Sequence, residues 1–194
     1  MDKVARIYTD GSCHGNPGAG GYCAIVLCDG ITREVKGSDW HTTNNRMELT
    51  AVIEGLKLIA DPYDAHILSD SKYVVEPIRK GNLRAYVNSP DRKNADLWEK
   101  ILRLSAFHKL TAEWVRGHSG NRLNQYCDKM ANQEATRVER EQDIRLFVFK
   151  ELLSDILATP DQIARAYSGD SRWLETVKKY HKQYFEHYDM LLAP

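Results

Sequence analysis

Four acidic side chains in four separate segments constrain the fold of this chain more than any other feature. Two of them end short apolar runs typical of strands, one opens an amphipathic helical segment, and one lies on a helical segment after a Gly-His-Ser-Gly loop. Asp10 and Asp70 end the two apolar runs, Glu48 opens the first helix, and Asp128 lies on the last. Strand ends and the helix turns that face them predict that all four carboxylates converge on one point.

Convergence of four carboxylates predicts a metal site. Like charges a few ångströms apart resist joint ionisation, so a bare cluster is unfavourable. A divalent cation is the usual remedy, and ligand sets made only of carboxylates favour hard cations such as Mg²⁺ or Mn²⁺.

The hydrophobic pattern predicts a five-stranded mixed sheet flanked by helices. The glycine-rich segment 15–21 is interpreted as a loop, and Asp29-Gly30 suits a tight hairpin turn. Asn44 or Asn45 is the expected helix cap. Strands are expected at 4–10, 22–28, 31–36, 65–69 and 111–115, and helices at 46–60, 71–80, 95–107 and 123–137.

The last part of the chain differs in kind. An apolar stripe over 146–157 and a Thr-Pro restart signal at 159–160 predict further helices, the last at about 171–190. We therefore divide the chain into residues 1–138 and a small all-helical C-terminal extension, 139–194. For this extension the sequence leaves several roles open: packing on the domain, self-association, substrate binding, or duplex DNA binding through a faint helix-turn-helix pattern.

Composition narrows the class of protein. The 194 residues carry 27 Lys and Arg against 27 Asp and Glu, so the large positive charge common in nucleic-acid binders is absent. The four cysteines lack metal-ligand spacing, and no secretory leader precedes them, so we expect reduced thiols and a cytoplasmic protein. No apolar stretch approaches the ~20 residues of a membrane span.

Six short motifs, in order and in register, resemble type 1 ribonuclease H of the bacterial kind. The resemblance covers about residues 1–135. Its motifs are Tyr-Thr-Asp-Gly-Ser at 8–12, Gly-Asn-Pro-Gly at 15–18, Thr-Thr-Asn-Asn-Arg-Met-Glu-Leu at 42–49, Ser-Asp-Ser at 69–71, Asp-Leu-Trp at 96–98, and Gly-His at 117–118 leading to Cys-Asp at 127–128.

The resemblance implies an active site. Asp10 would bridge two divalent ions, Mg²⁺ or Mn²⁺; Asp128 would help to hold one ion, and Glu48 with Asp70 the other. His118 would assist proton transfer or product release. The implied substrate-binding residues are Gly11, Ser12, Cys13, Asn16, Thr43, Asn44 and Asn45, of which Asn16 and Thr43 would hold a phosphate of the DNA strand.

The implied reaction is cleavage of the RNA strand of an RNA–DNA hybrid, without strong sequence specificity, leaving 5′-phosphate and 3′-hydroxyl ends. One alternative is a non-catalytic hybrid-binding module, which would have no use for four carboxylates. Another is the nuclease domain of a reverse transcriptase, against which the start at Met1 argues.

Two departures from the family pattern affect substrate binding. The segment 79–93 is shorter than the basic handle of well-known members, and it keeps five basic residues but no Trp. His41 stands where an arginine is common. Both changes predict weaker electrostatic binding, because each lost phosphate contact lowers the salt dependence.

Overall fold

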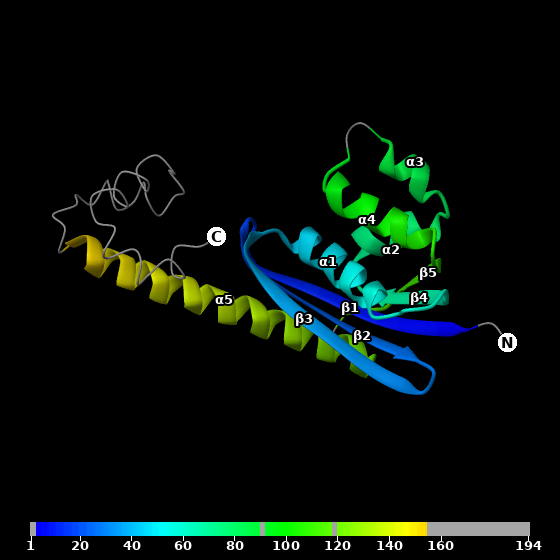
Figure 1. The fold of residues 1–194 in the computed structure, drawn as a ribbon, viewed down its shortest axis with the longest axis horizontal. Helices are drawn as coiled ribbons and strands as arrows, with labels where there is room; N and C mark the ends of the chain where they lie inside the picture. Colours follow the sequence, from blue (N-terminus) through cyan, green and yellow to red (C-terminus); the bar gives the residue numbers. More distant parts are fainter. Residues whose placement is uncertain (1–2, 90–91, 118–119, 155–194) are drawn as a thin grey trace. The chain divides into compact units, whose positions relative to one another are not determined.

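The structure is a computed structural model that describes residues 3–89, 92–117 and 120–154, with side chains up to residue 142. Five strands form one sheet in the order β3-β2-β1-β4-β5 (Figure 1). The strands are β1 Val4–Gly15, β2 Gly18–Cys28, β3 Ile31–Thr42, β4 Asp64–Ser69 and β5 Lys109–Trp114. The pairs β1–β2 and β2–β3 are antiparallel, whereas β1–β4 and β4–β5 are parallel. The predicted mixed sheet is therefore confirmed.

The helices cover both faces of this sheet. They are α1 Asn44–Lys57, α2 Lys72–Arg79, α3 Leu83–Val87, α4 Ala95–Ser105 and α5 Arg122–Ser154. The main core joins the sheet to α1, α2 and α4 around the fully buried Trp98, Leu49 and Ile67. A smaller core joins β2 to the start of α5 through Cys23, Ile25 and other apolar residues.

The glycine-rich segment is not the predicted loop. β1 runs to Gly15 and β2 begins at Gly18, so the glycines belong to a long hairpin. A Cβ on Gly18 would lie 1.9 Å from the carbonyl oxygen of His14, and one on Gly21 would lie 2.2 Å from the carbonyl oxygen of Ala131. These glycines therefore allow close backbone packing, against the paired strand and against α5.

Two boundaries and one additional helix also differ from what the sequence predicted. Thr43, not Asn44 or Asn45, is the N-cap of α1, and its hydroxyl accepts from the Arg46 backbone NH at 3.4 Å. The short helix α3 was not predicted. β3 extends to Thr42, six residues past its expected end, because it stays paired with β2 along that length.

The boundary expected between residues 138 and 139 falls within α5. The chain divides into two units, Met1–Glu139 and Arg140–Pro194, and α5 continues through the division. The helices expected from residue 159 onward lie outside the described residues, so the separate extension stays a prediction. In the described part of the chain, no helix is long and apolar enough to cross a membrane.

Candidate active site and metal centre

The sheet topology brings carboxylates from distant segments together. β1 and β4 are parallel neighbours, and Tyr8 pairs with Leu68. Two residues further along each segment, Asp10 on β1 and Asp70 directly after β4 therefore lie at the same level across the sheet. Glu48 reaches them from the second turn of α1. One carboxylate oxygen of each residue lies within 4.8 Å of one oxygen of the other two. Such spacing suits oxygen ligands around a shared cation.

Two glycines make this convergence possible. A Cβ on Gly11 would lie 2.3 Å from the backbone nitrogen of Glu48, so only glycine lets β1 approach the start of α1. A Cβ on Gly117 would lie 2.4 Å from Oδ2 of Asp70. The backbone at Gly117 thus lies directly against one ligand candidate.

Burial and mutual repulsion oppose ionisation of the cluster. Asp10 and Glu48 are each only 5% exposed. Burial, then the charges of Asp70 and Asp128, raise the pKa of Asp10 from 3.8 to about 8, although a hydrogen bond from the Gly11 backbone lowers it. Burial and the charge of Asp10 are the largest causes that raise the pKa of Glu48 well above its ordinary range.

Asp128 lies on α5 near the same centre. Its charge raises the pKa of both Asp10 and Glu48, although it is not one of the three residues with mutually close oxygens. The structure thus assembles three predicted ligands closely and places the fourth within electrostatic range. Their assignment as metal ligands stays a prediction.

The donor set fits a hard divalent cation. All the candidate ligands are carboxylates, the class that Mg²⁺ and Mn²⁺ prefer. Within the described residues, Oε2 of Glu48 is buried without a hydrogen-bond partner. A buried carboxylate oxygen without a partner is costly, and a bound cation would satisfy it.

The raised pKa values predict a pH-dependent gain of stability from metal. A carboxyl whose folded-state pKa exceeds its unfolded value stabilises the fold below the unfolded pKa, and this stabilisation is lost as pH rises through the folded pKa. For Asp10 that window runs from about 4 to about 8. Without metal, its contribution to the melting temperature should therefore fall across this range.

Thermal melts in EDTA and in Mg²⁺, at each pH, test this prediction. Mg²⁺ binds the ionised carboxylates, so the difference between the two melting temperatures should grow from pH 4 to pH 8. Groups that do not bind Mg²⁺ titrate in the same way in both conditions, so their effects on the melting temperature largely cancel in this difference. A constant or shrinking difference would contradict the assignment of the cluster as a metal site.

Several predicted substrate-binding residues lie together beside the cluster. The side-chain oxygen of Asn16, in the β1–β2 turn, accepts from the Asn44 backbone NH at 3.4 Å. The Cys13 thiol donates to the Thr42 carbonyl at 3.4 Å and links β1 to the end of β3. Gly11 is buried, Ser12 and Thr43 are partly exposed, and Asn45 is exposed. His118 lies outside the described residues.

Sequence reasoning did not find two supports of the site. The Trp114 indole donates to the backbone oxygen of Asp70 at 2.8 Å and so helps to position the chain after β4. Arg46 forms paired hydrogen bonds with Asp96, at 2.8 and 3.0 Å, which join the start of α1 to α4. The motifs containing Arg46 and Asp96 were recognised, but their contact crosses 50 residues and has no local signal.

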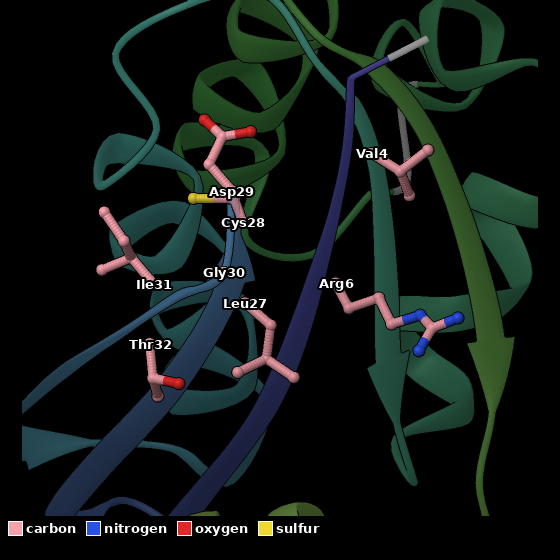
Figure 2. Close-up of a pocket in the computed structure, with 8 residues that line it drawn as sticks. All are labelled: Val4, Arg6, Leu27, Cys28, Asp29, Gly30, Ile31 and Thr32. Atoms are coloured by element: carbon pink, nitrogen blue, oxygen red, sulfur yellow. The ribbon is translucent and has the colours of Figure 1, made fainter. Parts of the chain in front are cut away.

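A pocket of about 390 Å³ lies away from this cluster. It is formed by the start of β1 and the β2–β3 turn, with Arg6, Leu27 and Ile31 among its lining residues (Figure 2). None of the predicted site residues lines it. The pocket is therefore not part of the candidate active site.

A five-stranded mixed sheet whose central strand β1 carries Asp10, next to Asp70 directly after β4, defines an α/β protein of the ribonuclease H fold. Among solved structures, LC9-RNase H1, described as a type 1 RNase H with the type 2 active-site motif, matches with a TM-score of 0.59 and 28% identity, over 70% of this chain and 74% of that chain. The N-terminal RNase H domain of a Mycobacterium tuberculosis protein matches with a TM-score of 0.58 and 28% identity, over 72% and 98%.

Sequence comparison agrees with the fold. The family model for RNase H matches residues 2–136. Ribonuclease H of Pelobacter propionicus is 46% identical over 69% of this chain and 85% of its own length, and that of Campylobacter curvus is 40% identical over 73% and 99%. The chain belongs to the ribonuclease H family, as a bacterial-like type 1 member, and is thus a ribonuclease H enzyme.

Proposed function

We propose that this chain hydrolyses the RNA strand of RNA–DNA hybrids by two-metal-ion catalysis, giving 5′-phosphate and 3′-hydroxyl ends without strong sequence specificity. The observation that carries the proposal is the convergence of Asp10, Glu48 and Asp70. Within the part of the chain that the structure describes, Oε2 of Glu48 is also buried without a hydrogen-bond partner. The relatives named ribonuclease H support the reaction class.

The carboxylates would hold the ions where charge develops. In-line attack on a phosphodiester places negative charge on the attacking, phosphoryl and leaving oxygens, and two bound Mg²⁺ or Mn²⁺ ions would supply the compensating positive charge. The family resemblance assigns Asp10 to bridge both positions, and Asp10 lies on the central strand β1 with Glu48 and Asp70 close to it. Asp128 would then serve one position, and Glu48 with Asp70 the other.

Small polar groups beside the cluster would recognise the hybrid. We assign contacts across the minor groove to the backbone of Gly11, Ser12 and Cys13 and to the side chains of Asn16, Asn44 and Asn45. Thr43 and Asn16 would bind a phosphate of the DNA strand. Neutral donors and acceptors can sense the 2′-hydroxyl and the groove shape without reading bases. Weak sequence preference follows from this chemistry.

A cleavage assay with end-labelled substrates tests the proposed function. The full chain should cut the RNA of a hybrid in Mg²⁺ or Mn²⁺, and it should leave duplex DNA and duplex RNA intact. EDTA should stop the reaction, and end analysis should give 5′-phosphates. Cleavage in EDTA, or equal cleavage of duplex RNA, would refute the proposal, and hybrid binding without cleavage would favour a binding module.

Replacement of His118 by Ala should lower kcat by on the order of 10²-fold or less, at or below the lower limit of the roughly 10²–10⁴-fold that general acid–base catalysis contributes, because His118 would assist the reaction without holding a metal ion. Single-turnover and steady-state rates with hybrid would measure the loss and separate chemistry from release. His66→Ala is the control, because His66 is a partly exposed histidine on β4. His108→Ala is less suitable, because His108 is buried. A loss as complete as that caused by removing a carboxylate ligand would show that His118 has a different role.

The remaining assignments concern the extension and the location of the protein. We propose that residues 139–194 form a helical extension that packs on protein or mediates self-association. We also propose a cytoplasmic location, in keeping with four free cysteines.

A further inference from the structure

Two side chains near the end of β1 contact α5 through a hydrogen-bond network. Nδ1 of His14 lies 2.7 Å from Oε2 of Glu139. The side-chain amide nitrogen of Asn132 lies 3.5 Å from Oγ of Ser12 and 3.5 Å from Nε2 of His14. We assign the tautomer that satisfies these contacts, in which Nδ1 of His14 donates to Glu139 and Nε2 accepts from Asn132. We call these four residues the hairpin network.

The backbone geometry explains why these four residues meet. The two β1 residues are next-but-one neighbours on a strand and so lie on the same side of the sheet, and the two α5 residues are about two helical turns apart. The elements also touch at this level. Ser12 pairs with Gly21, and a Cβ on Gly21 would lie 2.2 Å from the carbonyl oxygen of Ala131. α5 therefore lies directly against the hairpin where the network forms.

Different contacts hold the other side of the hairpin. Cys13 lies between the two network residues of β1 and so points to the opposite side of the strand. Its thiol donates to the Thr42 carbonyl at 3.4 Å. In the turn, Asn16 accepts from the Asn44 backbone NH at 3.4 Å. The hairpin is thus held between α5 on one side and the junction of β3 with α1 on the other.

The network should affect the position of the hairpin more than the stability of the fold. The His14 and Glu139 side chains are 26% and 47% exposed, and partly exposed pairs contribute little to the free energy of unfolding. α5 continues to Ser154, so Glu139 lies inside a helix rather than in a fraying last turn. The segment 15–21 is rich in glycine, which gives its backbone unusual freedom. Loss of the contact should therefore displace the hairpin and leave α5 in place.

We propose that His14 and Glu139 are positioning residues for substrate binding, which hold the backbone of residues 11–13 and the Asn16 side chain in the conformation that accepts the hybrid. The inference rests on the proposed function, which assigns hybrid contacts to those groups but none to Glu139. Apparent affinity falls in proportion to the fraction of molecules in the binding conformation. Loss of the network would therefore weaken hybrid binding and leave the chemical step unchanged.

Steady-state kinetics of the full chain with hybrid in Mg²⁺ test this inference. Glu139→Ala should raise KM about two- to fivefold and keep kcat, since fivefold corresponds to about 1 kcal/mol, the upper range for a partly exposed pair. Removing an acidic charge beside a polyanion should by itself lower KM, so a rise indicates lost positioning. Glu139→Gln keeps an acceptor oxygen for His14, and its KM should not exceed that of the unaltered chain. The dissociation constant for hybrid in EDTA should change in the same way.

A double-mutant cycle tests the contact itself. His14→Leu should raise KM by a similar factor, and adding Glu139→Ala to it should raise KM no further, because both changes remove one contact. Glu134→Ala is the matched control. Glu134 is also an acid on α5, but it pairs with Lys36 of β3 and with Arg137, so its removal should not raise KM.

Each outcome decides a different claim. Failure of the unaltered chain to cleave hybrid would refute the proposed function. Cleavage with an unchanged KM in Glu139→Ala would refute only the positioning role, even if the melting temperature falls. A rise in KM in His14→Leu alone would also overturn it, since His14 would then act without Glu139. Fully additive effects in the double variant would have the same consequence.

Discussion

Asp10→Asn should abolish hybrid cleavage, with a loss of about 10³-fold or more, because misplacing the bound ions removes several kcal/mol of transition-state stabilisation. In EDTA the same variant should melt at an equal or higher temperature, since a neutral amide relieves repulsion within the buried cluster. Each kcal/mol gained would raise the melting temperature by about 2–4 °C. Cleavage rates and thermal melts of the two proteins measure both effects.

Asp61→Asn is the control for this prediction. Asp61 pairs with Lys3 at the surface, where an ion pair contributes little, so activity and melting temperature should stay near those of the unaltered chain. Appreciable turnover by Asp10→Asn would remove the basis for assigning Asp10 as the bridging ligand.

Gly11→Ala should damage stability and activity together. The new Cβ would lie 2.3 Å from the backbone nitrogen of Glu48 and 2.5 Å from the backbone carbon of Met47, and neither atom can rotate away as a flexible side chain would. Forced separation of β1 and α1 should cost about 1–3 kcal/mol or more. It should also displace Glu48, and a shift of about 1 Å near the reacting groups can lower kcat by about 10²-fold.

Denaturant unfolding in EDTA and kcat in Mg²⁺ would measure the two losses. Gly30→Ala provides the control, because its Cβ would meet no atom within 4 Å, although its φ of +72° is a strained conformation for alanine. That variant should lose about 1–2 kcal/mol of stability at most and keep its kcat. Normal stability and activity in Gly11→Ala would mean that β1 and α1 can separate without cost.

Local sequence patterns predicted the five strands, most of the helices and the acids that they carry, but not the short helix α3. The period of hydrophobic residues is a local property, so the five strands and the helical stripe of Glu48, Val52 and Gly55 could be predicted from the sequence. All three residues of this stripe are buried in α1. The order and spacing of short motifs also identified the family. The four carboxylates could be named because each has a distinct local context, although their roles await experiment.

Which groups meet and which backbones touch could be seen only in the folded chain. The glycines of the β1–β2 hairpin look like a loop in sequence, whereas the pairing of β1 with β2 places them in strands. Their close packing against the paired strand and α5 explains why these positions are glycine. Likewise, the bulge that sets Trp40 and His41 opposite Ala19 arises from a register shift between β2 and β3. Among the described residues, Oε2 of Glu48 is buried without a hydrogen-bond partner. Such contacts join residues far apart in the chain, and local patterns carry no information about the distances between them.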